Sequence, residues 1–451
     1  MGSDLIYEMK LPKRKESHAW PSGKAYITVT NEEGTELRLP VLKSASMLLT
    51  GVVETGKSTL CKAYVKAYEE GYSGEDPDYR GVFFEIKPDD YMAAFFEKGD
   101  KVIAYDLGSF GDAAFKWCMI RELRQARNID AEIETLSREF FKDLIEKASH
   151  NLVWANAAKQ TFKAFLSSVI YRYRDCPSNR LLIKRLRIMT HIELMRFLAQ
   201  YEPNLPFLKN TFDYDPKDDS KFVMPKKGLD TMFFFDYVLQ RFSGCLVEDG
   251  GDTIHDFLHG KYGKHLFIVH DFAMADSMSM IERYFLKKMI DEKLSCSSDL
   301  YGKPLLLVLD EVDKVGYDFG LNDAVTLGRQ GGLTILLSTQ SIENLYKIAP
   351  EKNAEHITNG SLSGFQVVVS FRAGDPVTVE KLQTLFGTTD RVKITLGLSR
   401  LDSSQTVIVT EPKVTTEMLQ QLGVGEFYVK IKEGDPVKFK ILLNNQGGIL
   451  I

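Results

Sequence analysis

The residues with the clearest chemical potential in this sequence form the octapeptide Gly-Val-Val-Glu-Thr-Gly-Lys-Ser, residues 51–58. It fits the pattern G-x-x-x-x-G-K-[S/T], in which backbone N–H groups of a glycine-containing loop surround the phosphates of a nucleoside triphosphate. Gly51 and Gly56 suit such a loop because glycine adopts positive φ angles without a steric penalty. Lys57 would bring a positive charge to the β and γ phosphates, and the Ser58 hydroxyl would bind Mg²⁺.

The segments on either side of this octapeptide have the patterns that a phosphate-binding loop needs. An apolar run at residues 45–49 precedes it, and residues 58–71 read as a helix whose positive amino end would face the phosphates. Glu54 is unusual, because it puts a carboxylate at the tip of an anion-binding loop; it either points to solvent or weakens nucleotide binding. We expect the nucleotide to contact Gly51, Val52, Val53, Glu54, Thr55, Gly56, Lys57, Ser58 and Thr59.

A second acidic motif ends a strand pattern far along the chain. Residues 304–310 are apolar up to Asp310, and Glu311 follows at once. In enzymes that transfer phosphoryl groups, such a strand supplies one carboxylate that orients Mg²⁺ and another that polarises the attacking water. Asp310 is the candidate for the first role and Glu311 for the second. Many strands end in acidic residues, so this interpretation depends on both motifs belonging to one sheet.

Two more polar residues flank the apolar strand predicted at residues 333–338. Gln340 follows this strand, and the carboxyl ends of parallel strands face the ligand crevice. It is therefore a candidate sensor of the γ-phosphate, with a surface amide in a turn as the alternative. Arg329 precedes the strand in a glycine-flanked loop. It is either a solvated arginine or an arginine finger that reaches the site of a neighbouring chain.

The order of the predicted elements indicates an α/β protein with a long helical insertion. Strand and helix patterns alternate on both sides of the insertion, as expected for a mostly parallel sheet covered by helices. Between the two halves we find helical periodicity and no convincing strand. We expect an N-terminal β-hairpin segment at residues 1–44, a nucleotide-binding domain at 45–112 and 251–451, and an inserted all-α domain at 113–250.

The insertion contains the least readable part of the sequence. Residues 207–227, with an Asp-Pro-Lys-Asp-Asp run, are predicted as a loop. A basic cluster formed by Arg180, Lys184, Arg185 and Arg187 is either a contact for nucleic-acid phosphates or, the alternative that we favour, a solvated helix face. The periodicity predicts helices at residues 115–126, 130–147, 152–174, 191–201 and 229–242.

Length and composition exclude several classes of protein. A chain of 451 residues is expected to form two or three domains. Its net charge of −5 argues against a histone-like binder, but not against a motor with a basic inner channel. No signal peptide and no run of eighteen apolar residues is visible, so we expect no membrane span in this chain. The five scattered cysteines are expected to be reduced and mostly buried, in the cytoplasm.

Taken in order, these motifs resemble those of the HerA/FtsK branch of hexameric RecA-like motors, and most of all the TraG/TraD-type coupling ATPases of type IV secretion and conjugation. The resemblance covers roughly residues 20–440. It implies a RecA-like P-loop NTPase fold with an all-helical domain inserted between Lys57 and Asp310. It rests on the segments GVVETGKS, GVFFEIKPDDY, WANAAKQTFKAFLSSVIYR, TIHDFLHGK, LLLVLDEVD, GRQGGLTILLSTQS and VVVSFRAGDPVTVEKLQTLFG.

The resemblance also implies roles for single residues. Glu54 stands where the family usually has a glycine, which bears on nucleotide affinity. Arg372 falls where the family often has a second arginine at the subunit boundary. The other matching positions are Lys57 and Ser58 for phosphate and Mg²⁺, Asp310 and Glu311 for Mg²⁺ and water, Arg329 in a G-R-x-x-G loop, and Gln340 in a T-Q motif.

The implied activity is ATP hydrolysis by a ring, expected to be a hexamer, with ATP and Mg²⁺ as cofactors. DNA moving through the ring is the favoured cargo. The alternatives are a coupling ATPase that recruits protein substrates to a secretion channel and a nucleotide-gated adaptor without hydrolysis. The family's N-terminal transmembrane segments are absent from this sequence, so we expect that they were removed or that the protein docks on a membrane partner. The expected location is the cytoplasm or the inner face of the membrane.

Overall fold

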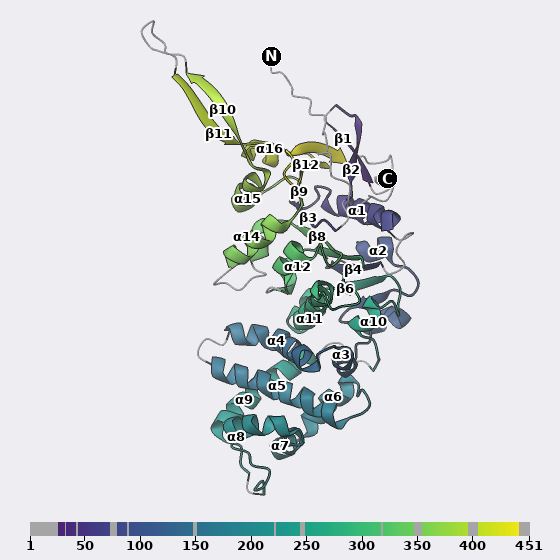
Figure 1. Ribbon diagram of the computed structural model, residues 1–451, viewed down its shortest axis with the longest axis vertical. Coiled ribbons are helices and arrows are strands. Elements are labelled where there is room, and N and C mark those ends of the chain that lie inside the picture. The colour runs from purple at the N-terminus through teal and green to yellow at the C-terminus, as the bar shows by residue number, and fades with distance from the viewer. Residues whose placement is uncertain are drawn as a thin grey trace.

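The computed structural model of the chain is elongated, with a sheet-containing body at one end and a bundle of helices at the other (Figure 1). A two-stranded ribbon projects from the body on the side away from the bundle. The structure describes residues 26–31, 33–41, 44–72, 79–87, 90–147, 151–220, 222–243, 249–316, 319–346, 354–395 and 405–441.

One large sheet organises the body. Its strand order is β2-β1-β13-β12-β9-β3-β8-β7-β4-β6-β5, and the seven strands from β9 to β5 run parallel. This is the mostly parallel sheet that the sequence predicts. The strands are β1 Tyr26–Thr30, β2 Glu36–Pro40, β3 Met47–Thr50, β4 Arg80–Glu85, β5 Lys101–Ile103, β6 His265–Val269, β7 Leu305–Asp310, β8 Leu333–Thr339, β9 Val367–Ser370, β12 Glu426–Ile431 and β13 Val437–Ile441.

Both faces of the parallel strands are covered, which explains their apolar sequences. In β7, Leu305, Leu307 and Leu309 belong to one hydrophobic cluster, while Leu306 and Val308 belong to another. Side chains alternate between the faces of a strand, so the two clusters are the two layers that sandwich the sheet. Helix α1, Lys57–Tyr72, packs into the second layer, and α11, Ala275–Leu294, into the first.

Helix α11 also joins the body to the helical bundle. Arg283 of α11 forms an ion pair with Asp143 of the bundle helix α4, at 2.8 Å, and Lys288 pairs with Glu132 at 3.1 Å. The bundle helices are α3 Met119–Gln125, α4 Ile129–Lys147, α5 Leu152–Arg172, α6 Asn179–Ile188, α7 His191–Ala199, α8 Leu205–Phe212 and α9 Lys226–Phe242. They occupy the segment predicted as an inserted all-α domain, whose exact boundaries stay a prediction.

The shorter helices of the body surround the sheet. They are α2 Tyr91–Phe95, α10 Ile254–Leu258, α12 Leu321–Leu327, α13 Ile342–Leu345, α14 Ala354–Gly364, α15 Pro376–Phe386 and α16 Thr416–Gln420. Short 3₁₀ helices lie at Leu107–Ala113, Glu202–Asn204, Phe272–Met274 and Val312–Val315. Among the helices of the described residues, none combines the length and apolar character needed to cross a membrane.

The prediction of a loop at residues 207–227 is wrong at both ends, because helix α8 covers its start and helix α9 begins at Lys226. Helix α8 ends only at Phe212, and Leu208 and Phe212 are buried one turn apart on the same face. Pro206 does not prevent the helix, because proline is tolerated in the first turn. Asp213, with φ 53°, ends it in the left-handed conformation. The Asp-rich run begins only after this cap.

The helix predicted from residue 115 starts four residues late, at Met119. The preceding segment is extended, because the amide of Phe115 donates to the carbonyl of Val102 at 2.8 Å and Trp117 forms a bridge with Asp252. Local periodicity does not report such long-range pairing.

The projecting ribbon consists of β10, Thr388–Thr395, and β11, Gln405–Pro412. The two strands pair with each other and, within the described residues, not with the large sheet. The sequence patterns at residues 392–396 and 406–409 predict two short strands here, and the observed strands are longer. Leu396 lies outside the described residues.

The prediction that the cysteines are mostly buried is half right. Cys61 and Cys118 are buried, whereas Cys176 and Cys296 are exposed. Cys245 lies outside the described residues.

Candidate nucleotide-binding site

The order of the strands brings the two distant motifs to one edge of the sheet. Strand β8 lies between β3 and β7, and all three run parallel. Thr50 at the end of β3 pairs with Thr339 of β8, and Asp310 at the end of β7 pairs with Ser338. The octapeptide loop, Asp310 and Gln340 therefore all follow carboxyl ends that meet at the same edge.

The backbone of the loop explains its two glycines. Gly51 has φ 153° and Gly56 has φ 108°. A Cβ atom on Gly51 would lie 2.6 Å from the Cβ of Phe371, so a side chain there is excluded. The amide of Leu60 makes the first helical hydrogen bond, to the carbonyl of Gly56 at 3.0 Å. The earlier amides at the amino end of α1 have no helical acceptor and can face an anion.

Lys57 lies over the loop and faces the acidic residues. Its Nζ donates to the carbonyl of Gly51 at 2.6 Å and to that of Val52 at 3.0 Å. Burial lowers the pKa of the Lys57 ammonium, while the charges of Asp310 and Glu311 act in the opposite direction. The two sequence motifs are thus electrostatic neighbours in the folded chain.

Asp310 and Glu311 occupy different environments. Burial, together with the neighbouring Glu311 charge, raises the pKa of Asp310 to about 6. Glu311 has φ 51°, a left-handed conformation that is rare outside glycine and is concentrated at functional sites. Its amide donates to the carbonyl of Ser338 at 3.0 Å, and its carboxylate accepts a hydrogen bond from the side chain of Gln340. Gln340 therefore orients Glu311.

Comparison with known proteins identifies the family of the chain. A family described as the type IV secretion-system coupling protein DNA-binding domain matches residues 39–442. The chain belongs to this coupling-protein family. No curated protein matches it.

Solved structures of coupling proteins share the fold. The unbound bacterial conjugative coupling protein TrwBdeltaN70 is 18% identical with a TM-score of 0.68, over 94% of this chain and 90% of that chain. TrwB in complex with ADP and Mg²⁺ is 19% identical with a TM-score of 0.64, over 91% and 88%. VirB4 of Thermoanaerobacter pseudethanolicus is 12% identical with a TM-score of 0.51, over 95% and 100%. The RecA-like P-loop fold with its all-α domain is confirmed.

In this coupling-protein chain, Arg329 lies away from the site formed by Lys57, Asp310 and Gln340. It is exposed and precedes the amino end of β8, whereas Gln340 follows the carboxyl end. A strand of this length separates the two by roughly 20 Å. Arg372, in contrast, lies at the carboxyl edge of the sheet, since it follows strand β9. Its side chain is exposed and its carbonyl accepts the amide of Val52 at 2.9 Å, directly beside the loop.

Glu54 points to solvent, which is one of the two possibilities that the sequence left open. It is exposed at the loop tip, with φ 62°. This left-handed conformation costs a residue with a side chain roughly 1–2 kcal/mol, a penalty that glycine would not carry. The effect of the Glu54 charge on nucleotide affinity stays a prediction.

Sequence reasoning missed a further carboxylate at this edge, and this one is fully buried. Glu85 ends β4, is 1% exposed, and accepts hydrogen bonds from the amides of Tyr91 at 2.8 Å and Met92 at 3.1 Å. Burial raises the pKa of Glu85 to about 7, and the Asp310 charge acts in the same direction. An acidic residue that ends a buried strand is the same signal that identified Asp310, so the pattern was available.

Proposed function

We propose that this chain is an ATPase that assembles into a ring, expected to be a hexamer, and uses ATP hydrolysis to move DNA in conjugative or type IV secretion-type transfer. One observation carries the proposal: Lys57, Asp310, Glu311 and Gln340 converge at one sheet edge of a coupling-protein fold. A ring docked on a membrane partner of the secretion channel fits a chain whose family delivers substrates to such channels.

The residues at the edge fit a nucleotide with Mg²⁺. The free amides at the start of α1 and the Lys57 ammonium offer donors for phosphate oxygens, and Ser58 and Asp310 offer oxygen ligands. Mg²⁺ at such sites takes one or two protein ligands besides phosphates and water, and it offsets the phosphate charge. This suits an edge where the described residues form no group of three His, Cys, Asp or Glu ligands. TrwB, of the same fold, has been solved with ADP and Mg²⁺.

Each catalytic residue then has a distinct task. Lys57 exchanges its contacts with loop carbonyls for contacts with the β and γ phosphates. Glu311 polarises the attacking water, and Gln340 holds Glu311 in place and reports the γ-phosphate. The left-handed backbone of Glu311 fixes the direction from which its carboxylate approaches.

The position of Arg329 is an argument for assembly into a ring. Because it is roughly 20 Å from its own site, it can stabilise transition-state charge only in the site of another chain. We propose that Arg329 acts in trans across a subunit boundary, and that Arg372 lies at the same boundary from the side of the loop.

Specific ATPase activity, measured against protein concentration with and without DNA, tests this proposal. We expect the activity to rise with concentration, as chains assemble, and to increase with DNA in a strongly salt-dependent manner. Activity that depends on concentration but ignores every DNA would favour the alternative of a coupling ATPase for protein substrates. No hydrolysis at any concentration would reject the motor and favour the nucleotide-gated adaptor.

A further inference from the structure

The turn that follows Glu311 has a defined position in the body. The carbonyl of Glu311 accepts the amide of Lys314 at 3.1 Å, and the 3₁₀ helix Val312–Val315 follows Glu311 directly. Val312 and Val315 are buried, so packing fixes the turn. Because Glu311 has a left-handed backbone and is bonded to this turn, the position of the turn sets the direction of its carboxylate.

Arg283 of helix α11 contacts this turn. Its Nη1 donates to the carbonyl of Val315 at 3.0 Å. Its Nη2 faces helix α4, where it forms an ion pair with Asp143 at 2.8 Å and donates to the carbonyl of Glu139 at 3.4 Å. Glu139 and Asp143 lie one turn apart on the same face of α4. One planar guanidinium therefore joins the turn after Glu311 to two successive turns of a bundle helix.

The bundle side of this contact extends to a second helix. The other carboxylate oxygen of Asp143 accepts a hydrogen bond from Arg241 of helix α9 at 3.2 Å. Asp143 thus lies between an arginine of the body and an arginine of the bundle. Helix α11 lies between the sheet and α4 (Figure 1), and it packs against both the 3₁₀ helix and α4. It is therefore placed to connect them.

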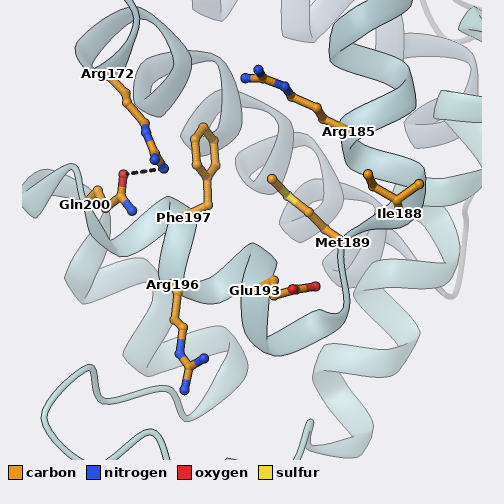
Figure 2. A pocket seen from close by; sticks show the side chains of 8 residues that line it. All are labelled: Arg172, Arg185, Ile188, Met189, Glu193, Arg196, Phe197 and Gln200. Carbon is orange, nitrogen blue, oxygen red and sulfur yellow. Dashed lines mark hydrogen bonds between the residues drawn. The ribbon is translucent and has the colours of Figure 1, made fainter.

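Burial distinguishes Arg283 from arginines at the surface of the bundle. Figure 2 shows Arg172, Arg185 and Arg196 around a surface hollow, where Arg196 is exposed and pairs with Asp219 at 2.7 Å. Exposed pairs of this kind contribute little, because water competes for both charges. Arg283 is 1% exposed. Water cannot replace its partners, so a shift of one partner must move the guanidinium or break a contact at high cost.

A second buried cation at the same interface lacks the link to the turn. Lys288 of α11 is 2% exposed and pairs with Glu132 of α4 at 3.1 Å. Its other ion-pair partners within the described residues are Glu122 and Glu292, and neither belongs to the turn. Lys288 therefore joins α11 to the bundle only, whereas Arg283 joins both of them to the turn.

We propose that Arg283 is a positioning residue for Glu311, through which the position of the helical bundle controls ATP hydrolysis. When α4 moves relative to the sheet, Asp143 and the Glu139 carbonyl move with it. The rigid guanidinium then either draws the Val315 carbonyl along or loses it, and both events redirect the Glu311 carboxylate. The control of hydrolysis rests on the proposed ATPase function, whereas the link from the bundle to the turn does not.

Amide hydrogen exchange of the full chain tests the link without catalysis. Asp143→Asn removes the charge that pairs with Arg283. Glu132→Gln is the matched control, since it removes a carboxylate of the same helix that pairs with the other buried cation. The peptide that covers residues 311–316 should exchange at least about fivefold faster in Asp143→Asn and less than about twofold faster in Glu132→Gln. Equal exchange in the two variants, or faster exchange in the control, overturns the proposal.

ATP turnover tests the consequence for hydrolysis. Asp143→Asn should lower kcat at least about fivefold and change KM for ATP less than about twofold, because the loop that holds the phosphates is untouched. In a Glu311→Gln background it should have no further effect, since both changes act through one carboxylate. Glu132→Gln should keep the kcat of the unchanged chain. An equal loss of kcat in Glu132→Gln, or an effect of Asp143→Asn that persists beside Glu311→Gln, shows a merely structural role and overturns the proposal.

The two readouts separate this inference from the proposed function. If the unchanged chain hydrolyses no ATP, the proposed function fails, and the exchange measurement still decides whether Arg283 links the bundle to the turn. If hydrolysis is normal but residues 311–316 exchange equally in both variants, the ATPase assignment stands and the positioning role of Arg283 is wrong.

Discussion

Buried charged groups lie at both edges of the parallel sheet. Within the described residues, His265 at the amino edge has ion-pair partners, whereas Asp310 and Glu85 at the carboxyl edge have none. At the carboxyl edge, burial raises the pKa of Asp310 to about 6 and that of Glu85 to about 7. At the amino edge, His265 lies between Asp100 and Glu69, with 2.9 Å from a ring nitrogen to each carboxylate. Burial opposes its charge, yet the hydrogen bond to Asp100 and the ion pair with Glu69 raise the pKa of His265 to about 9.

This difference distinguishes residues that act in function from residues that act in stability. A buried charge with a partner of opposite charge in the chain stabilises the fold. Carboxylates whose ionised form is disfavoured by burial can instead interact with a ligand that brings positive charge. Under the proposed function, Mg²⁺ would bring this positive charge to the carboxyl edge, whereas the amino edge is balanced within the chain. Changes at the first edge should alter turnover, and changes at the second should alter stability.

The largest effect is expected for Lys57→Ala. The variant loses the charge that faces the phosphates, so ATP hydrolysis should fall to the background of the assay. Steady-state phosphate release measures it. Lys66→Ala, at an exposed position of the same helix, is the control and should keep normal turnover. Retained hydrolysis in Lys57→Ala would remove the loop assignment.

Glu311→Gln should separate binding from chemistry. The amide keeps the shape of the side chain but cannot accept a proton from water, so turnover should fall about 10²-fold or more while ATP affinity stays nearly unchanged. Equilibrium binding of a labelled ATP analogue beside single-turnover hydrolysis checks both halves. Parallel loss of affinity and turnover would contradict the role of Glu311 as the water-activating group.

At the amino edge, stability should depend on pH through His265. Its folded-state pKa of about 9 exceeds the ordinary 6.5, so its contribution is complete below pH 6.5 and is lost as the pH rises through about 9. This pKa difference corresponds to at most about 3–4 kcal/mol in the free energy of unfolding. Urea unfolding should give a lower free energy of unfolding at alkaline pH than at neutral pH. His265→Gln should remove most of this pH dependence. His259→Gln, at the surface, should leave the dependence intact.

The smallest effect is expected at the tip of the loop. Glu54→Gly removes a carboxylate near the phosphates, so ADP affinity should rise roughly fivefold. Isothermal titration measures it. Glu54→Ala removes the same charge and should give the same gain in affinity, whereas only the glycine variant also relieves the left-handed strain of roughly 1–2 kcal/mol, which should raise the free energy of unfolding. Unchanged affinity in both variants would show that the exposed carboxylate has no influence on the nucleotide.

The strands of the sheet were readable from the sequence, but their arrangement was not. Long apolar runs such as β7 and β8 are buried on both faces and therefore leave a clear pattern. Their order is not sequential, since β3 lies between β8 and β9, so only the family resemblance predicted that the two motifs meet. Glu85 was missed although it ends the buried strand β4 in the way that Asp310 ends β7, because a single acidic residue after a strand is a weak signal without a second motif beside it. Helix α8 was missed because proline and aspartate concealed its ends.

Some site residues could likewise be identified from the sequence, whereas the contacts of others depend on the fold. Local spacing was enough to select the octapeptide loop, Asp310 and Glu311, because each motif is contiguous. The contact from Gln340 to Glu311 depends on the neighbouring strands β7 and β8, and the position of Arg329 at the far edge depends on the direction of β8. Their roles in catalysis stay predictions.

Mixing subunits tests the central claim most directly, namely that each site combines the carboxyl edge of one chain with Arg329 of the next. Lys57→Ala and Arg329→Ala should each be inactive alone, and Arg329→Ala should still bind ATP. When the two variants are mixed, some boundaries pair an intact loop with an intact Arg329, so part of the ATPase activity should return. If no mixing ratio restores hydrolysis while both variants still assemble, Arg329 does not act in trans and the account is wrong at its core.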